Sequence, residues 1–364
     1  MKTVKTSPFD DQRPGTSGLR KKVAVFRTPG YLENFVQSIF AVYPKLRGGT
    51  LVLGGDGRYY NRVAIQTILK MACANGVSRV IVGQGGILST PAVSHLIRKY
   101  ATQGGIVLSA SHNPGGPDGD FGIKLNIDNG GPAPEQVTEA IFDYSKRIDA
   151  YSIAETDDID LDDIGDYSIN DMRVSVIDPV EDYAELMATL FDFDAIRALI
   201  ATPGFRMAFD AMHAVTGPYA RRIFEELRGA PAGTVMNGEP LEDFGGGHPD
   251  PNLVHAAELV ARTQGDDTIG YFQLLENAFR VLQKELQFIV GLLRQGEFDQ
   301  LDLVELVLPN EPPGILAVGP CFRSKAGGIS RVVEGQVVFL ENFAVMEVGH
   351  RNFGCGDEKV IPAL

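Results

Sequence analysis

The stretch that decides the fold is residues 50–108, TLVLGGDGRYYNRVAIQTILKMACANGVSRVIVGQGGILSTPAVSHLIRKYATQGGIVL. Its runs LVLGG, RVIVG and GGIVL are apolar and are bounded by glycine or polar residues, which is typical of buried strands. Between them, residues 61–75 and 90–100 carry apolar side chains at helical spacing. This strand–helix–strand–helix–strand order predicts an α/β fold with parallel strands.

Polar residues follow the carboxyl ends of the three predicted strands. Asp56 follows the first strand, Gln84 the second, and the segment Ser109–Gly116 the third. Ligands of α/β sheets gather at this edge. We therefore expect the three loops to share one rim.

A second α/β unit is predicted further along the chain. A helical stretch over residues 178–190 is followed by the apolar run MAFDAMHAV, a helix over residues 219–227 and the run GTVMNG. We expect a domain boundary near residues 185–200.

The last hundred residues have a different character. Tyr271–Leu293 (YFQLLENAFRVLQKELQFIVGLL) is a strongly apolar stretch with helical spacing, and it predicts a long helix that buries a broad face against a protein partner or a second copy of the chain. Residues 314–318 and 332–348 are predicted as short strands separated by proline and glycine.

Charge and composition restrict the function. The formal net charge is −14, which disfavours nucleic acid and anionic membranes, so an anionic ligand must be held by a local basic pocket. The cysteines Cys73, Cys321 and Cys355 are far apart, so neither a disulfide framework nor a thiolate metal site is expected. There is no apolar leader in the first residues and no long apolar segment, and we expect a soluble cytoplasmic protein that does not cross a membrane.

An acidic run over residues 155–171 has aspartates at alternate positions, as a calcium loop does. However, Asp163 stands where such a loop needs glycine, and Ile169 where it needs glutamate. A solvated surface segment is therefore the preferred interpretation.

The segment Ser109–Gly116 (SASHNPGG) is the strongest candidate for chemistry. Its proline and glycines predict a tight turn with open backbone amides, which can present the hydroxyl of Ser111 and hold phosphate oxygens. Serine-rich turns after strands are also common without any function, and this alternative stays open.

Two further segments carry cations. Residues 12–22 (QRPGTSGLRKK) combine two glycines and the hydroxyls of Thr16 and Ser17 with Arg20, which can bind phosphate in a bidentate manner; a basic surface turn is the alternative. Lys124 lies in the otherwise apolar stretch DFGIKLN, where it needs an anion or must reach the surface. His213 and His248 lie in segments with glycine and proline turns and are expected to be structural hydrogen-bonding residues.

Taken together, the segments resemble the phosphoglucomutase family of the α-D-phosphohexomutase superfamily, whose patterns are PGTSGLRK, TASHNPGG and DFGIKFN. The resemblance continues, in order and at family spacing, through roughly residues 1–262. The further segments are LGGDGRYYN at 53–61, GQGGILSTPA at 83–92, IDPVEDY at 177–183, FDAMHAVTGPYA at 209–220 and NGEPLEDFGGGHPDPNL at 237–253.

The resemblance implies mixed-sheet α/β domains sandwiched by helices. Residues 1–190 would form a complete first domain, 191–263 the start of a second, and 264–364 a divergent tail of uncertain fold. The implied activity interconverts glucose 1-phosphate and glucose 6-phosphate through a phosphoserine and glucose 1,6-bisphosphate. Ser111 would be the phosphoserine and Mg²⁺ ligand through its phosphate, His112 and Lys124 would lie at the reacting phosphate, and Arg20, Thr16 and Ser17 would bind the phosphosugar.

One family segment is missing from the sequence. Members hold Mg²⁺ with the aspartates of a DGDGDR loop, and no such loop occurs here; Gln264–Asp267 has adjacent aspartates that do not replace it. The sequence therefore leaves three interpretations open: a phosphotransferase of this family, a non-catalytic protein that binds sugar phosphates or a protein partner, and a truncated gene product.

Overall fold

The computed structural model describes residues 1–15, 17–252, 254–263, 269–273, 298–307, 316–324, 329–340 and 343–351. The chain divides into two compact units, residues 1–278 and 279–364. The division into three parts at residues 190 and 263 stays a prediction.

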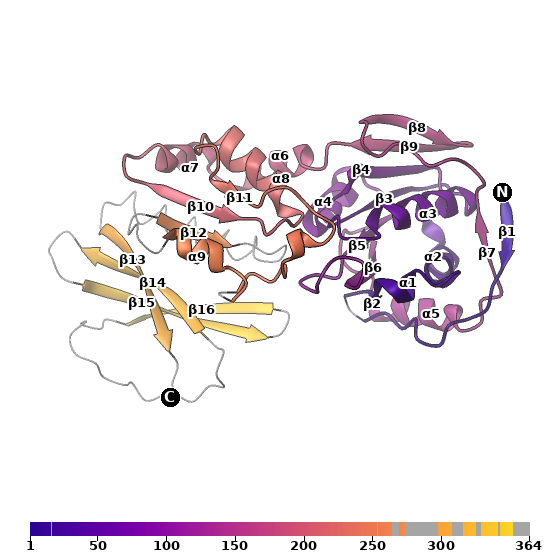
Figure 1. Cartoon of the computed structure of the whole chain (residues 1–364), viewed down its shortest axis with the longest axis horizontal. Coiled ribbons are helices and arrows are strands. Elements are labelled where there is room, and N and C mark those ends of the chain that lie inside the picture. The colour runs from indigo at the N-terminus through magenta and orange to yellow at the C-terminus, as the bar shows by residue number, and fades with distance from the viewer. Residues whose placement is uncertain are drawn as a thin grey trace. The chain divides into compact units, whose positions relative to one another are not determined.

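The first unit is built on a seven-stranded mixed sheet (Figure 1). The strands follow the order β2-β6-β5-β3-β4-β9-β8. The four strands from β5 to β9 in this order are parallel, and β2, β6 and β8 are antiparallel to their neighbours. Their bounds are β2 Leu19–Lys22, β6 Asp120–Ile127, β5 Gly104–Leu108, β3 Thr50–Gly55, β4 Arg79–Ile87, β9 Met172–Ile177 and β8 Gly165–Ile169.

Helices cover both faces of this sheet. Leu51 and Leu53 of β3 belong to the core that α2 and α3 share, whereas the glycine backbone of β5 lies against Val93 and Ile97 of α4. Alternate residues of a strand point to opposite faces, so the two sets of helices lie on opposite sides. The elements are α1 Val23–Phe26, α2 Tyr31–Val42, a 3₁₀ turn Pro44–Leu46, α3 Asn61–Ala74, α4 Thr90–Lys99 and α5 Glu135–Ser145, with β1 Lys2–Lys5 paired to β7 Ala150–Ile153. The predicted βαβαβ order is confirmed.

The acidic run lies on the surface of this unit. Asp158 and Asp162 form exposed ion pairs with Lys70 and Arg62. Its last part is strand β8, which the sequence reasoning did not predict because the segment is polar and pairs only along its β9 edge.

A three-stranded parallel sheet, β11-β10-β12, completes the described part of the first unit. Its elements are α6 Glu181–Leu190, α7 Phe193–Ile200, β10 Arg206–Asp210, α8 Thr216–Ala220, a π-helix Arg221–Leu227, β11 Val235–Met236, a 3₁₀ turn Phe244–Gly246, α9 Ala257–Thr263 and β12 Ile269–Gln273. The second α/β unit is thus confirmed.

The predicted helix over Tyr271–Leu293 is wrong at its start. Tyr271–Gln273 belong to β12, which pairs in parallel with β10. Aromatic and β-branched residues suit a strand, and pairing with a neighbouring strand outweighs the local helical spacing. Residues 274–293 lie outside the described residues, as do the acidic residues near 264–267.

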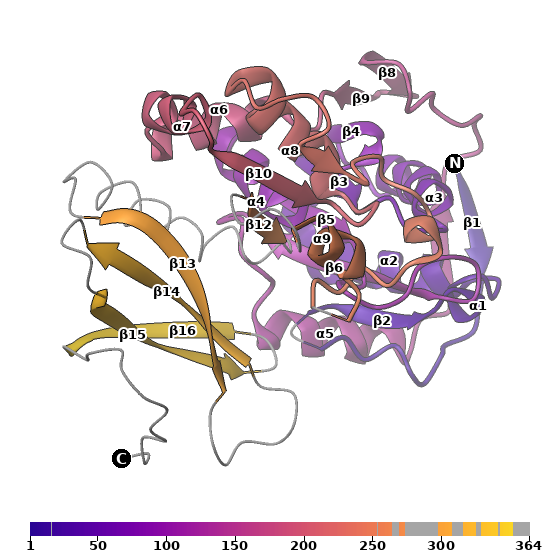
Figure 2. The ribbon, with the colours of Figure 1, turned by 60° about the vertical axis from the view of Figure 1, so that its left-hand side comes forward.

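The second unit contains an antiparallel sheet in the order β13-β14-β15-β16 (Figure 2). The strands are Phe298–Val307, Leu316–Ser324, Ile329–Leu340 and Phe343–Arg351. The two predicted strand regions are confirmed, and β13 was missed. No helix in the described ranges is long and apolar enough to cross a membrane.

Candidate functional site

Ser111 lies on a strained turn after strand β5. Its backbone φ is +57°, in the left-handed region that a non-glycine residue rarely adopts. The amide of Ser111 donates a hydrogen bond to Oγ of Ser109 over 3.0 Å, and Nδ2 of Asn113 donates to Oδ2 of Asp120 over 2.9 Å. The half-buried serine is therefore held in an uncommon conformation by its own loop.

A buried arginine fixes this turn. Arg58, fully buried, donates from Nε to both carboxylate oxygens of Asp56 at 3.0 Å. Its Nη2 donates to the carbonyl of Ser111 at 2.7 Å, and its Nη1 donates to the carbonyl of Asp120 at 2.9 Å and that of Asn113 at 3.3 Å. We call this group the Arg58 clamp: one planar guanidinium ties three carbonyls of the loop to the carboxylate that follows β3.

The sequence reasoning placed Asp56 on the rim but missed Arg58. The bonds of Arg58 to the loop span more than 50 residues of chain, so no local pattern reveals them. Gln84 was expected on the same rim, but its Nε2 donates to the carbonyl of Asp162, in the acidic run.

The segment Leu241–His255, which we call the facing loop, packs against the serine turn. The amide of Gly116 donates to the carbonyl of Glu242 at 3.0 Å. The ring of Phe244 lies 5.2 Å from the guanidinium of Arg58, and a Cβ on Gly115 would come within 2.7 Å of that ring. An open pocket between the two loops is lined by Asp56, Ser111, His112, Ala211, Met212, Ala214, Val215, Thr216, Phe244, Pro249 and Pro251.

The predicted cations lie on the adjoining edge of the large sheet. Arg20 of β2 is paired with Gly122 of β6, and opposed residues of an antiparallel pair share a face. Lys124 is two residues further along β6 and lies on that same face. The amide of Ser109 donates to the carbonyl of Gly122 at 3.0 Å, which joins this edge to the serine turn.

The N-terminal glycine segment packs closely on β6. Gly18 has a φ of +89°, and a Cβ there would lie 2.4 Å from the carbonyl oxygen of Ile123 and 2.8 Å from Cβ of Lys124. The segment beside Arg20 therefore requires glycine at this position. Ser17 is half-buried in it, and Thr16 lies outside the described residues.

His112 lines the pocket beside Ser111. Its Nδ1 is 3.8 Å from Oδ1 of Asp250 in the facing loop. Burial lowers the pKa of the His112 imidazole below its usual value, although Asp250 opposes the shift. The ring is therefore neutral at neutral pH and can accept a proton.

The two histidines that were expected to be structural differ from each other. His213 has a backbone φ of +53°. Its Nδ1 is 3.0 Å from the carbonyl oxygen of Glu239, a contact that fits a structural hydrogen-bonding residue. In contrast, Nδ1 of His248 is buried and has no hydrogen-bond partner among the described residues. The expected structural hydrogen bond is therefore not made by this ring nitrogen, and the ring of His248 stacks on that of His255.

The described residues do not bring together a group of three or more carboxylates, the ligands that Mg²⁺ prefers. Within the described ranges, the group of potential ligands that lie together is His248, Asp250 and His255. Mg²⁺ takes six oxygen ligands, and this group supplies two imidazoles and one carboxylate. A magnesium site made by these three residues does not fit.

Comparison with known proteins agrees with this architecture. A family model described as "Phosphoglucomutase/phosphomannomutase, alpha/beta/alpha domain I" matches residues 11–152. The matched part of the chain belongs to the phosphohexomutase superfamily by this model and by the relatives below.

Named relatives refine the assignment to the phosphoglucomutases of that superfamily. The chain is 64% identical to the phosphoglucomutase of Rhizobium radiobacter over 270 residues, which cover 73% of this chain and 50% of the relative. It is 54% identical to the cytoplasmic phosphoglucomutase of Populus tremula over 271 residues, 71% of this chain and 47% of the relative. Among solved structures, the open form of pp63/parafusin, a phosphoglucomutase from Paramecium, matches with a TM-score of 0.72 at 45% identity and covers 76% of this chain and 53% of its own. The chain thus spans about half the length of the relatives it matches.

Proposed function

We propose that Ser111 is a phosphoryl acceptor and that the chain is a phosphotransferase of the phosphoglucomutase type. The observation that carries this proposal is the turn itself. Ser111 stands at a positive φ in a pocket, and the buried Arg58 clamp holds its carbonyl. A structure that maintains such strain around one hydroxyl favours a chemical role for it.

In the proposed step, Oγ of Ser111 attacks a phosphorus atom of glucose 1,6-bisphosphate. The Oγ–P bond forms while the bond from phosphorus to the sugar oxygen breaks, and the serine proton passes to that oxygen. Neutral His112 can carry this proton, and Lys124 either transfers it or stabilises the spread negative charge. Arg20, Ser17 and Thr16 would bind the sugar phosphate.

The net interconversion of glucose 1-phosphate and glucose 6-phosphate belongs to the same proposal. In the full cycle, phosphorylated Ser111 gives its phosphoryl group to O6 of glucose 1-phosphate, the resulting glucose 1,6-bisphosphate turns around, and its other phosphoryl group returns to Ser111 as glucose 6-phosphate leaves. Because the chain spans about half of its relatives, this complete cycle is proposed and not deduced. A cytoplasmic location is proposed because relatives such as that of Populus tremula are named as cytoplasmic. Association with a protein partner or a second copy through the apolar residues 271–293 is also proposed, and residues 274–293 lie outside the described residues.

A second candidate function is favoured by the missing DGDGDR loop. Without the family's carboxylate ligands for Mg²⁺, the pocket can bind a phosphosugar without transferring its phosphate. The second candidate is therefore a non-catalytic protein that binds sugar phosphates.

The deciding experiment is intact mass measurement with phosphosite mapping after incubation with glucose 1,6-bisphosphate and Mg²⁺. We expect one added phosphate on Ser111 and none on Ser111→Ala. Saturable binding of glucose 1-phosphate without any phosphate on Ser111 would support the binding protein instead. A coupled assay for glucose 6-phosphate then tests the full cycle, and turnover no higher than that of Ser111→Ala would refute the mutase activity.

A further inference from the structure

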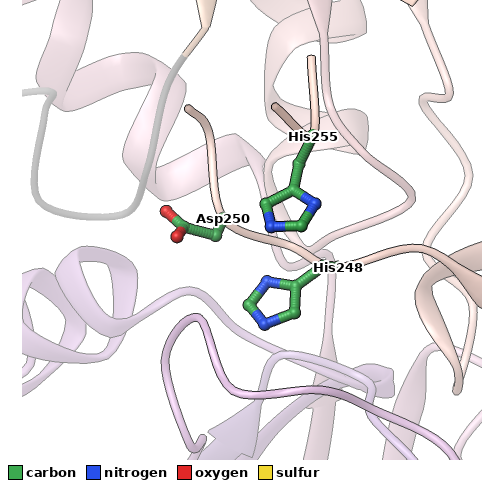
Figure 3. Close-up of side chains that lie close together, drawn as sticks. All are labelled: His248, Asp250 and His255. Atoms are coloured by element: carbon green, nitrogen blue, oxygen red, sulfur yellow. The ribbon is translucent and has the colours of Figure 1, made fainter. Parts of the chain in front are cut away.

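Three potential metal ligands come together in the facing loop, next to the Ser111 pocket. His248, Asp250 and His255 each offer a ligand atom, and these atoms all lie within 4.8 Å of one another. Figure 3 shows the three side chains close together, with the two imidazoles beside each other and the carboxylate oxygens of Asp250 directed away from them in this view. The sequence reasoning had given none of them a role in binding a metal.

The turn at Asn252 explains why His248 and His255, seven positions apart along the chain, meet. The amide of Asn252 donates to the carbonyl of Asp250, and its side-chain oxygen accepts from the amides of Val254 and His255. The chain therefore reverses direction between Asp250 and His255. The prolines at 249 and 251 fix φ on both sides of Asp250.

His248 provides the observation that points to a ligand. Its Nδ1 is buried and has no hydrogen-bond partner among the described residues. A buried polar nitrogen without a partner is costly, and each such atom in a native structure calls for a cause. A bound cation supplies that cause, since a neutral imidazole nitrogen has a lone pair to donate.

The present side-chain arrangement needs a small adjustment to bind an ion. The imidazole rings of His248 and His255 are stacked, with centroids 4.5 Å apart and planes 11° apart. Zinc binds nitrogen and oxygen at about 2.0–2.2 Å, so its ligands stand roughly 3–3.5 Å from one another. His255 is exposed and can rotate into place, whereas the more buried His248 keeps its position.

We propose that His248, Asp250 and His255 form a binding site for a divalent transition-metal cation of the zinc type. Imidazole favours zinc over magnesium, and two histidines with one carboxylate are a ligand set that zinc takes. Three protein ligands leave a coordination position for water or an anion. Pro249 and Pro251, which flank Asp250, line the Ser111 pocket, so the ion lies at the pocket wall.

This site uses none of Ser111, Arg20 and Lys124. It touches the residues of the proposed phosphoserine chemistry through Asp250, whose Oδ1 lies 3.8 Å from Nδ1 of His112. Binding of the metal is therefore expected to be the same in Ser111→Ala as in the natural chain, and a failure of either proposal leaves the other standing.

The test is a titration of the full-length, metal-free chain with Zn²⁺ by calorimetry and with Co²⁺ by visible absorption. We expect saturable binding of one equivalent that His248→Gln, Asp250→Asn or His255→Gln each weakens by about tenfold or more. His95→Gln is the matched control, because His95 lies on α4 outside the cluster, and it should bind as the natural chain does. A large excess of Mg²⁺ should not displace the ion.

His255→Gln keeps the test decisive, since the exposed side chain can be replaced without loss of the fold, which circular dichroism verifies. Unchanged affinity and stoichiometry in this variant and in Asp250→Asn would overturn the proposal. Absence of saturable binding by the natural chain at micromolar Zn²⁺, or displacement of the ion by equimolar Mg²⁺, would overturn it as well.

Discussion

Two loops line the same pocket and are held in opposite ways. The serine turn, which we define as Ser109–Gly119, is fixed by hydrogen bonds from the buried Arg58 clamp to backbone carbonyls and by close backbone contacts. The facing loop, Leu241–His255, touches the turn through Glu242 and Phe244, but further along it carries an exposed His255 and a buried nitrogen of His248 without a described partner.

The difference separates a preorganised site from an adaptable one. Groups that must stabilise charge as it develops are most effective when their positions are fixed before reaction. A ligand-binding group can instead complete its contacts when the ligand arrives. We therefore expect substitutions at the serine turn to lower stability strongly, and those at the end of the facing loop to change it little.

The largest effect is expected at the Arg58 clamp. Arg58→Met removes one partner of a buried ion pair and leaves Asp56 charged and unpaired. Such a loss costs about 3–5 kcal/mol of the free energy of unfolding. Urea unfolding of the full chain, followed by circular dichroism, measures it.

Arg62→Met is the matched control for this prediction. Arg62 forms a pair with Asp162 in which the two side chains are 46% and 67% exposed. An exposed pair contributes about 0–1 kcal/mol, so the change should be correspondingly small. Equal effects of the two substitutions would contradict a clamp that depends on burial.

The next effect is expected where the two loops touch. In Gly115→Ala, the new Cβ would lie 2.7 Å from Cδ2 of Phe244 and 2.9 Å from the carbonyl oxygen of Glu242. Overpacking of this kind costs about 1–3 kcal/mol. Gly165→Ala is the control, because the nearest atom to its Cβ is 3.9 Å away. Urea unfolding should separate the two, and comparable stabilities would show that the facing loop yields freely at Phe244.

The sequence predicted the elements whose pattern is local. The apolar runs at β3, β4 and β5 and the helices between them follow from hydrophobic spacing, and the turn at Ser111 follows from its proline and glycines. Strands β2 and β8 are the antiparallel edge strands of the same sheet, where exposed polar positions obscure the pattern.

The parts that could not be predicted depend on contacts between distant segments. Arg58 resembles any arginine after a Gly-Asp-Gly turn until the fold brings Ser111 and Asp120 to its guanidinium. The histidines of the facing loop meet only because the chain reverses at Asn252. The apolar spacing from Tyr271 indicated a helix, but pairing with β10 makes its first residues a strand.

A smaller effect concerns the backbone strain at Ser111. A residue with a Cβ costs about 1 kcal/mol more than glycine in the left-handed region. Ser111→Gly should therefore be more stable than Ser111→Ala by roughly 0.5–1 kcal/mol, even though glycine is less restricted in the unfolded chain. Thermal unfolding of both variants measures the difference.

Ser109 supplies the matched pair for this comparison. It lies two residues earlier in the same loop and is absent from the residues with positive φ. Ser109→Gly should be less stable than Ser109→Ala, the reverse of the order at Ser111. If the glycine and alanine variants rank in the same order of stability at both positions, the positive φ of Ser111 does not decide which variant is more stable.

The smallest effect is expected at His255, at the end of the facing loop. Its side chain is exposed and contacts the ring of His248 by stacking, so His255→Gln in the metal-free chain should change the free energy of unfolding by less than about 0.5 kcal/mol. Urea unfolding in the presence of a chelator measures this. Zn²⁺ should then stabilise the natural chain more than the variant, because an ion that binds only the folded state adds about 2.7 kcal/mol at a hundred times its Kd and about 1.4 kcal/mol when the Kd is tenfold higher. A loss above 2 kcal/mol without metal would mean that the stacked pair is itself a structural element, and the contrast between the two loops would not hold.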